Sequence, residues 1–594
     1  MLDFIKTMFA SALGFVLAIV LFFFFIFIIV VATSSDPEPV VRSNSILHMK
    51  ASGSISERPS SDPFEQIFST QHGAAITLED VEANLRKAAV DEKIEGVLLE
   101  IDMIGASWPV LQQMRRALIS FKNESGKFVY ATTNDIGFNE QGYYLATAAD
   151  SIFAPPNTMM MFDGFAIEGV FMKDLFDKIG VKAEVIHIGD YKTAGDSFFR
   201  NEFSDADREQ LTAVFTDIVH ELESAIAERT GWSIEETHEF MNQPPRLSID
   251  HYYEHGLIDV LTTQTDFENF LKERSGINEN RDINLLPNRR YSRVSERTAG
   301  LGRPARESIA VIHASGVIMP DMGGSPFPGG EASINATNFK ESLDAALNNS
   351  NVKAIVVRID SPGGSASTSD LIWQMIREAS EEKPIIASMA GVAASGGYYI
   401  AMAADKVLAE KTTITGSIGV IGMQFDASEL LEDKIGLNFD EIRFHKNANW
   451  LNPTSPMTQE QREGFKYFVD SFYDVFLARV AESRDMTTED VHAVAQGRIW
   501  SGQAAYEAGL VDKVGGLDDA IRAAAEAAEL EEYSLRVFPR EKTIFELFAE
   551  SSQVRVQNYL YRNVPYHNEI QFIKAMQTLD RPTPWTIMPY FISY

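Results

Sequence analysis

The chain contains two related halves, and this internal repeat limits what it can fold into more than any other feature of the sequence. Three segments of the first half recur in the second half in the same order: residues 94–102 match 352–360, residues 142–150 match 397–405, and residues 253–259 match 506–512. The offsets are 258, 255 and 253 residues, and three ordered matches at nearly constant spacing are hard to obtain by chance. The period is far longer than a solenoid repeat, so it indicates a duplicated domain.

Each half alternates strand-like and helix-like segments. In the second half, residues 352–359 form a short apolar, β-branched run, residues 368–378 have helical spacing, and residues 384–389 predict another strand. A further helical segment comes late in each half, at 208–228 and 459–481. Strands alternating with helices are typical of βαβ units around a largely parallel sheet, so we expect the α/β class.

The N-terminal region predicts a membrane anchor. Residues 8–32 contain no charged side chain, and about 20 apolar residues suffice to span a bilayer. This run is longer than the apolar part of a cleaved signal peptide, so we expect an uncleaved transmembrane helix. Lys6 precedes the span while Asp36 and Glu38 follow it, which places the short N-terminus in the cytoplasm and the bulk of the chain outside.

These features divide the chain into six parts. We expect an N-terminus with anchor at 1–32, a spacer rich in Ser, Pro and Glu at 33–61, a first copy at 62–274, a solvated Arg-rich linker at 275–307, a second copy at 308–540 and a tail at 541–594. The tail is rich in aromatic residues, which suits either subunit contacts or ordinary core packing.

Composition excludes several classes of function. The chain has 52 Lys and Arg against 84 Asp and Glu, a net charge of −32, and phosphate binding depends mainly on basic side chains, so we expect no nucleic-acid partner. It has no cysteine, which excludes disulfides, thiolate metal sites and a cysteine nucleophile. The His-Glu pairs at 220 and 238 lack the second histidine of a zinc-protease helix, so we expect neither a metal nor a cofactor.

A candidate nucleophile stands in the second copy. Ser395 follows a predicted strand and precedes a helix, and Gly396 leaves the space beside its hydroxyl open. Amides at the start of a helix favour developing negative charge, and the glycines Gly363 and Gly364, which end another strand, offer further amides for an oxyanion hole. Each feature also has an ordinary interpretation, a helix N-cap serine and a Pro-Gly turn.

Three motifs in order make a resemblance specific. Ser-Pro-Gly-Gly at 361–364, Ala-Ala-Ser-Gly-Gly-Tyr-Tyr at 393–399 and Thr-Gly-Ser-Ile-Gly-Val at 415–420 resemble the signal peptide peptidase A (protease IV) family in its long, duplicated form. The resemblance implies two tandem copies of a ClpP/crotonase-like domain. It further implies a serine endopeptidase on the periplasmic side of the bacterial inner membrane, a homotetramer, and apolar substrates such as remnant signal peptides.

The same resemblance implies a Ser/Lys dyad. Ser395 matches the nucleophile of this family, and Lys192, within Gly-Asp-Tyr-Lys-Thr-Ala at 189–194 of the first copy, matches its general base. Ser417 matches the serine that hydrogen-bonds the lysine, and amides of Gly363 or Gly364 together with Gly396 would hold the oxyanion. The chemistry is reasonable, because burial lowers the pKa of a lysine and a neutral amine can take the serine proton.

Two alternatives to Lys192 remain open. Lys446 aligns with it at an offset of 254 residues and resembles the base of the short family form. A histidine could serve instead, since His187, His313 and His445 lie near relevant segments, although none stands in a motif tied to Ser395.

The first copy has no matching nucleophile. Glu140 aligns with the serine position and Phe162 with Ser417, and we expect Glu140 to be a solvated loop carboxylate rather than part of a second active centre. Two other functions compete with the peptidase: a crotonase-type acyl-CoA enzyme, which needs neither anchor nor lysine, and a non-catalytic membrane scaffold.

Overall fold

A computed structural model describes residues 38–58, 76–134, 137–244, 246–321 and 333–540, together with Gly14 and the short strand β20 (Trp585–Ile587). Apart from Gly14, the anchor predicted at 8–32 lies outside the described residues, as does most of the predicted tail. Within the described ranges, no helix combines the length and the apolar character needed to cross a membrane.

Two parallel sheets with the same strand order confirm the duplication. In the described part of the first copy the order is β6 (Val260–Leu261), β4 (Ser151–Ala154), β3 (Phe128–Thr132), β2 (Ile94–Gly105), β1 (Ser45–Ser54) and β7 (Leu285–Pro287). The second copy repeats it with β18 (Lys513–Val514), β14 (Lys406–Ala409), β13 (Ile385–Ala394), β11 (Val352–Ser361), β8 (Ser308–Ser315) and β19 (Ser534–Phe538). Neighbours in both series pair in parallel, as the α/β pattern predicts.

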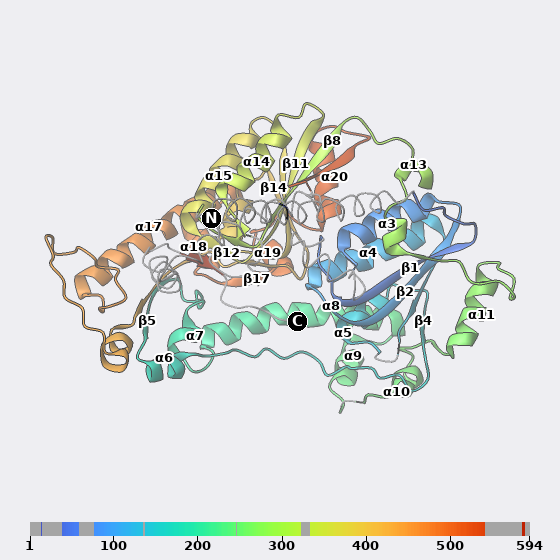
Figure 1. The fold of residues 1–594 in the computed structure, drawn as a ribbon, viewed down its shortest axis with the longest axis horizontal. Coiled ribbons are helices and arrows are strands. Elements are labelled where there is room, and N and C mark those ends of the chain that lie inside the picture. The colour runs from blue at the N-terminus through green and yellow to red at the C-terminus, as the bar shows by residue number, and fades with distance from the viewer. Residues whose placement is uncertain are drawn as a thin grey trace, which may run out of the picture.

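Helices cover both sheets (Figure 1). The helices that bear on the site are α4 (Trp108–Ser125) and α5 (Glu140–Ala146) of the first copy, and α15 (Ala366–Ser380), α16 (Gly396–Ala401) and α20 (Leu517–Ala527) of the second. The two long helices predicted late in each half are confirmed as α8 (Asp205–Thr230) and α17 (Gln459–Arg484). Figure 1 shows α8 running along the molecule beneath both halves.

Two segments predicted to be a spacer and a linker contribute strands to the first sheet. Strand β1 lies inside the predicted spacer, and β7 lies inside the predicted Arg-rich linker, where it pairs with β1. Leu286 and Tyr291 of that linker are buried, while Arg289 and Arg290 between them are exposed. The expectation of a solvated linker was wrong because average composition hides buried side chains that alternate with charged ones.

The two copies share buried contacts. The apolar core of the first copy extends to Ala394, Ile414 and Ile499 of the second. Arg358 on β11 is fully buried, and its Nε donates to Glu57 of the first copy at 2.9 Å. Because both kinds of contact exclude water, they hold the copies in one fixed arrangement.

We expect the Glu57→Ala variant to unfold more readily than wild type. Removing one partner of a buried pair leaves the Arg358 guanidinium without its charge partner, a loss of about 3–5 kcal/mol in the free energy of unfolding. Denaturant unfolding of both proteins measures it. A matched control is Lys340→Ala, which removes an exposed pair with Asp344 and should change that free energy by less than about 1 kcal/mol. Equal small changes in the two variants would contradict a structural role for the buried pair.

Candidate active site

A strand pair between the copies brings Lys192 to the second copy. Strand β5 (Lys182–Ile188) of the first copy pairs antiparallel with β16 (Val420–Asp426) of the second, and Ile188 lies opposite Val420. Because the strands run in opposite directions, the residues after β5 and those before β16 meet at the same end of the pair. Lys192 follows β5 and Ser417 precedes β16, so the pairing places them together.

Lys192 makes three hydrogen bonds at the centre of the site. Its Nζ donates to Ser395 Oγ at 2.9 Å, to Ser417 Oγ at 2.9 Å and to the Ser417 carbonyl at 3.0 Å. All three residues are fully buried. Burial, which disfavours the charged ammonium, lowers the pKa of Lys192 to about 7. Near neutral pH a large fraction of the amine is therefore uncharged and able to accept the Ser395 proton.

Ser395 stands in a strained turn between β13 and α16. Its φ is 54° and its ψ is −115°, a backbone conformation that residues other than glycine rarely adopt and that costs about 1–3 kcal/mol. The residue occupies the N-cap position of α16, yet its side chain makes no capping hydrogen bond there. Its backbone amide donates to the Gly416 carbonyl at 2.8 Å. The ordinary interpretation as an N-cap serine therefore fails, and Oγ is directed to Lys192 instead.

The loop that carries Lys192 is held by residues that the sequence did not single out. The Tyr191 amide donates to the Gln496 carbonyl at 2.9 Å, and a Cβ added to Gly497 would lie 2.4 Å from Lys192 Cβ. From α8, Gln210 donates to Thr193 Oγ1 at 3.0 Å. The sequence alone did not reveal this contact: Gly497 has a positive φ of 81° that only the structure shows, and the polar side chains of α8 look like an exposed helix face.

The predicted oxyanion glycines belong to two elements that contact each other, the short strand with Gly363 and Gly364 and the helix α16 with Gly396. The Gly363 amide, at the start of β12 (Gly363–Ser365), donates to Ser361 Oγ at 3.1 Å, so an oxyanion would compete with that hydroxyl. Gly396 begins α16, where amides of the first turn lack acceptors within the helix. A Cβ added to Gly397 would lie 2.6 Å from the Ser361 carbonyl oxygen. Only a glycine therefore fits at this second position after Ser395.

The short strand β20 lies along the edge of β12. Strand β20 pairs antiparallel with β12, with Ile587 opposite Gly363 and Trp585 opposite Ser365. Trp585 also pairs with Ile421 of β16. The backbone edge next to Ser395 thus accommodates a strand between β12 and β16.

The alternative bases lie elsewhere. Lys446 is exposed and forms an ion pair with Glu460. His187 contacts the Gly189 carbonyl, and burial of His313 on β8 lowers its pKa to about 3. Among the described residues, no histidine is hydrogen-bonded to Ser395.

The serine position of the first copy is filled rather than solvated. Glu140 begins α5 and is buried, and its Oε1 accepts hydrogen bonds from the amides of Asp163 at 2.8 Å and Gly164 at 2.9 Å. Burial raises the pKa of the Glu140 carboxyl, although the amide bonds oppose this shift. Phe162 packs against Tyr143. The expectation of a solvated loop carboxylate was wrong, because Glu140 satisfies the amides of the following loop internally.

Comparisons with known proteins identify relatives over most of the chain. A family model described as Peptidase family S49 matches residues 122–278 and 377–531. The relative named Serine protease SPPA, chloroplastic, of Arabidopsis thaliana is 36% identical over 491 residues, which cover 82% of this chain and 70% of that protein. Protease 4 of Salmonella typhi is 30% identical over 535 residues, or 87% and 83% of the two chains. Among solved structures, a ClpP1 mutant of Listeria monocytogenes matches with a TM-score of 0.24 and 16% identity, over 36% of this chain and 94% of that one.

We expect the acylation rate of Ser395 to follow the titration of Lys192. Only an uncharged amine can accept the serine proton, so the rate should rise about tenfold per pH unit below the Lys192 pKa of about 7 and level off above it. The measurement is the rate of acylation by an activated ester at a series of pH values. A limb near the ordinary lysine pKa of about 10.4 would contradict the burial of the amine.

We expect the Gly497→Ala variant to lose most of this reactivity. The new Cβ would overlap the Lys192 backbone and move the amine away from Ser395 Oγ, and a displacement of about 1 Å can cost about 10²-fold. The matched control is Gly509→Ala, which has a similar positive φ of 75° but open space around the new Cβ. Acylation rates of both variants and wild type measure the difference, and equal effects would mean that backbone strain alone matters.

Proposed function

Because the chain belongs to peptidase family S49, we propose that it is a serine endopeptidase in which Ser395 is the nucleophile and Lys192 the general base. The observation that carries the proposal is the 2.9 Å hydrogen bond between Lys192 Nζ and Ser395 Oγ, inside a fully buried site built from both copies. A crotonase-type acyl-CoA enzyme, the main competing function, draws no support from a serine–amine pair of this kind.

The proposed reaction follows from the positions of the side chains. Ser395 Oγ attacks the peptide carbonyl while its proton passes to Lys192 Nζ, and Lys192 then delivers this proton to the leaving amine. Water, deprotonated by the same amine, hydrolyses the acyl-enzyme and releases Ser395. Ser417 orients the amine through its hydroxyl and carbonyl without adding a charge that would raise the pKa.

Backbone amides stabilise the oxyanion in this scheme. The amides of Gly363 or Gly364 on β12 and of Gly396 on α16 would hold the oxyanion, since these two elements contact each other and the dipole of α16 favours negative charge at its first turn. The Gly363 amide exchanges Ser361 Oγ for the oxyanion as the tetrahedral intermediate forms.

We propose that the substrate is an extended, apolar peptide such as a remnant signal peptide. The pairing of β20 with β12 supports an extended substrate, because a peptide in the place of β20 would gain main-chain hydrogen bonds from the edge of β12. Apolar side chains would enter the water-poor surroundings of the dyad without a desolvation penalty.

The proposal includes a single-pass anchor in the bacterial inner membrane, a periplasmic catalytic body and a homotetramer. Residues 8–32 have the length and composition of a spanning helix. Ile442, Phe444 and Tyr467 are each more than three-quarters exposed, and exposed apolar side chains of this size support contact with another copy.

The test is cleavage of a synthetic signal peptide by the purified full-length protein. We expect Ser395→Ala and Lys192→Ala to lower kcat by about 10³-fold or more, since members of such a unit fail together. Lys446→Ala is the control and should retain wild-type kcat, because its exposed amine is paired with Glu460. Full activity in either dyad variant, or acyl-CoA binding by a wild-type protein without peptidase activity, would contradict the proposal.

A further inference from the structure

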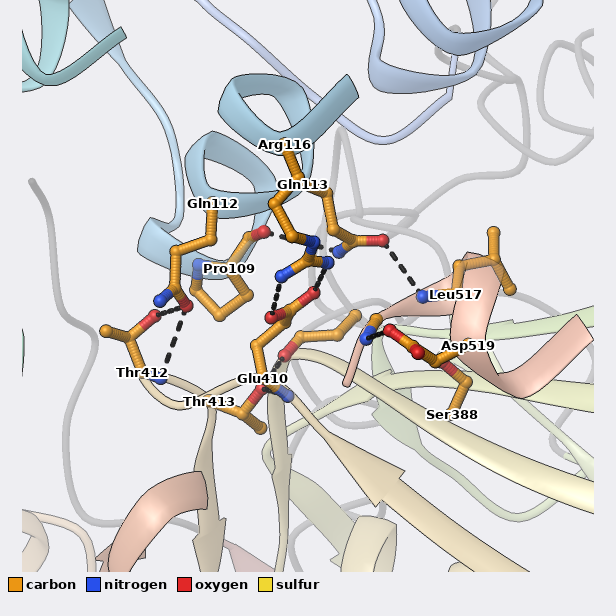
Figure 2. A network of polar contacts seen from close by, with 12 residues as sticks. Pro109, Gln112, Gln113, Arg116, Ser388, Glu410, Thr412, Thr413, Leu517 and Asp519 are labelled. Atoms are coloured by element: carbon orange, nitrogen blue, oxygen red, sulfur yellow. Dashed lines mark hydrogen bonds and ion pairs between the residues drawn. The ribbon is translucent and has the colours of Figure 1, made fainter. Parts of the chain in front are cut away.

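Helix α4 of the first copy is hydrogen-bonded to a loop of the second copy, residues 410–413, as Figure 2 shows. Arg116 Nη1 donates to Glu410 Oε2 at 2.6 Å, and its Nη2 bonds the other carboxylate oxygen. One turn earlier, Gln112 Oε1 accepts hydrogen bonds from Thr412 Oγ1 at 2.6 Å and from the Thr412 amide at 3.4 Å. Glu410, Thr412 and Gln112 are buried, so water competes weakly for these contacts.

The loop is also tied to the strand that carries the nucleophile. Thr413 Oγ1 donates to the Ala390 carbonyl of β13 at 2.8 Å and accepts a hydrogen bond from the Glu410 amide at 3.1 Å. Strand β13 ends at Ala394, directly before Ser395. The loop therefore connects α4 to the strand that carries Ser395.

Directly after the loop, the chain forms the other wall of the site. Strand β15 (Ile414–Gly416) pairs in parallel with β13, and Gly416 lies opposite Ala394. The Gly416 carbonyl accepts the hydrogen bond of the Ser395 amide at 2.8 Å, and Ser417 is the next residue. Any shift of the loop is thus transmitted to the Ser395 backbone and to both Ser417 oxygens.

Apolar packing supports the same connection. Ala394 and Ile414, which flank the site, belong to the core cluster that contains Trp108 at the start of α4. A Cβ added to Gly391 of β13 would lie 2.9 Å from Ser107 Cβ, at the N-cap of α4. With this close approach, α4 has little freedom to move independently of β13.

We propose that Arg116 and Gln112 are positioning residues, which through the loop 410–413 hold Ser417 and the Ser395 backbone in place for the dyad. The inference rests on the proposed peptidase. It gives the first copy a second role at the site besides supplying the lysine. Both residues act through the loop, so they are distinct from the catalytic groups.

The proposal has a specific consequence for pH dependence. The lowered pKa of Lys192 comes from burial, so a looser Ser417 segment that admits water would raise it toward the ordinary value. Activity would then need a higher pH, and kcat would fall because Oγ and Nζ lose their alignment. KM should stay the same, since the proposed place of the peptide is the edge of β12 and not the loop 410–413.

The experiment compares Arg116→Ala and Gln112→Ala with wild type in the full-length protein. Burst titration with an ester gives the concentration of active sites. We expect kcat per active site to fall about 10-fold to 10²-fold, with an unchanged KM and an acidic limb displaced to higher pH. Arg116→Lys, which keeps a charge for Glu410, should recover part of the loss.

The neighbouring Arg115→Ala is the matched control. Arg115 lies on the same helix, but it donates to Thr147 and Glu228 within the first copy. It should therefore keep the wild-type kcat and pH limb. Thr412→Val keeps the side-chain shape and removes only the hydroxyl bonded to Gln112. If an Arg116 variant does not fold, kcat and the pH limb of Thr412→Val test the proposal in its place. A lower Tm with unchanged kcat and pH limb in these variants would overturn the proposal.

A second measurement separates this inference from the proposed function. The pH dependence of labelling of the Lys192 amine, quantified by mass spectrometry, reports its pKa without any peptidase activity. A midpoint moved to higher pH in Gln112→Ala supports the positioning role even if no peptide is cleaved. If wild type cleaves peptide, Ser395→Ala does not, and Gln112→Ala matches wild type in kcat and labelling, this inference alone is wrong.

Discussion

The chemistry of this site depends on an amine that is buried without an opposite charge. Lys192 Nζ meets the hydroxyl of Ser395 and the hydroxyl and carbonyl of Ser417, all of them uncharged. Burial alone therefore lowers its pKa to about 7, whereas a neighbouring carboxylate would restore the ammonium. Each contact that excludes water from the amine, including the close approach of Gly497 and the pairing of β5 with β16, consequently contributes to the proposed reaction.

Duplication allows one site to be built from two unequal copies. The first copy supplies Lys192, which follows β5. At the position that corresponds to Ser395 the first copy has Glu140, whose carboxylate accepts hydrogen bonds from two loop amides. The corresponding lysine of the second copy, Lys446, lies at the surface in an ion pair. The interface between the copies is therefore part of the site. The buried pair of Arg358 with Glu57 and the hydrogen bonds from α4 to the loop 410–413 stabilise that interface.

Much of the architecture could be predicted from local patterns. The repeated segments indicated duplication. Alternating strand-like and helix-like segments indicated parallel sheets, because the period of apolar residues and the content of β-branched residues can be read in short stretches of sequence. Strands β1 and β7 were missed for the same reason: they stand in segments whose average composition is polar, although Leu286 and Tyr291 face the core. The close contact of Gly497 with Lys192 joins segments far apart in the chain, which no window contains.

The sequence by itself determined that the chain is a duplicated α/β protein, and its motifs singled out Ser395, Lys192 and Ser417 as residues worth bringing together. Only the tertiary structure decided that Lys192 rather than Lys446 lies beside Ser395, across 203 residues of chain, and that Glu140 is buried. The physical reason is that two lysines in similar motifs have the same intrinsic chemistry. Their surroundings separate them, since burial lowers the pKa of one amine while solvent and Glu460 surround the other.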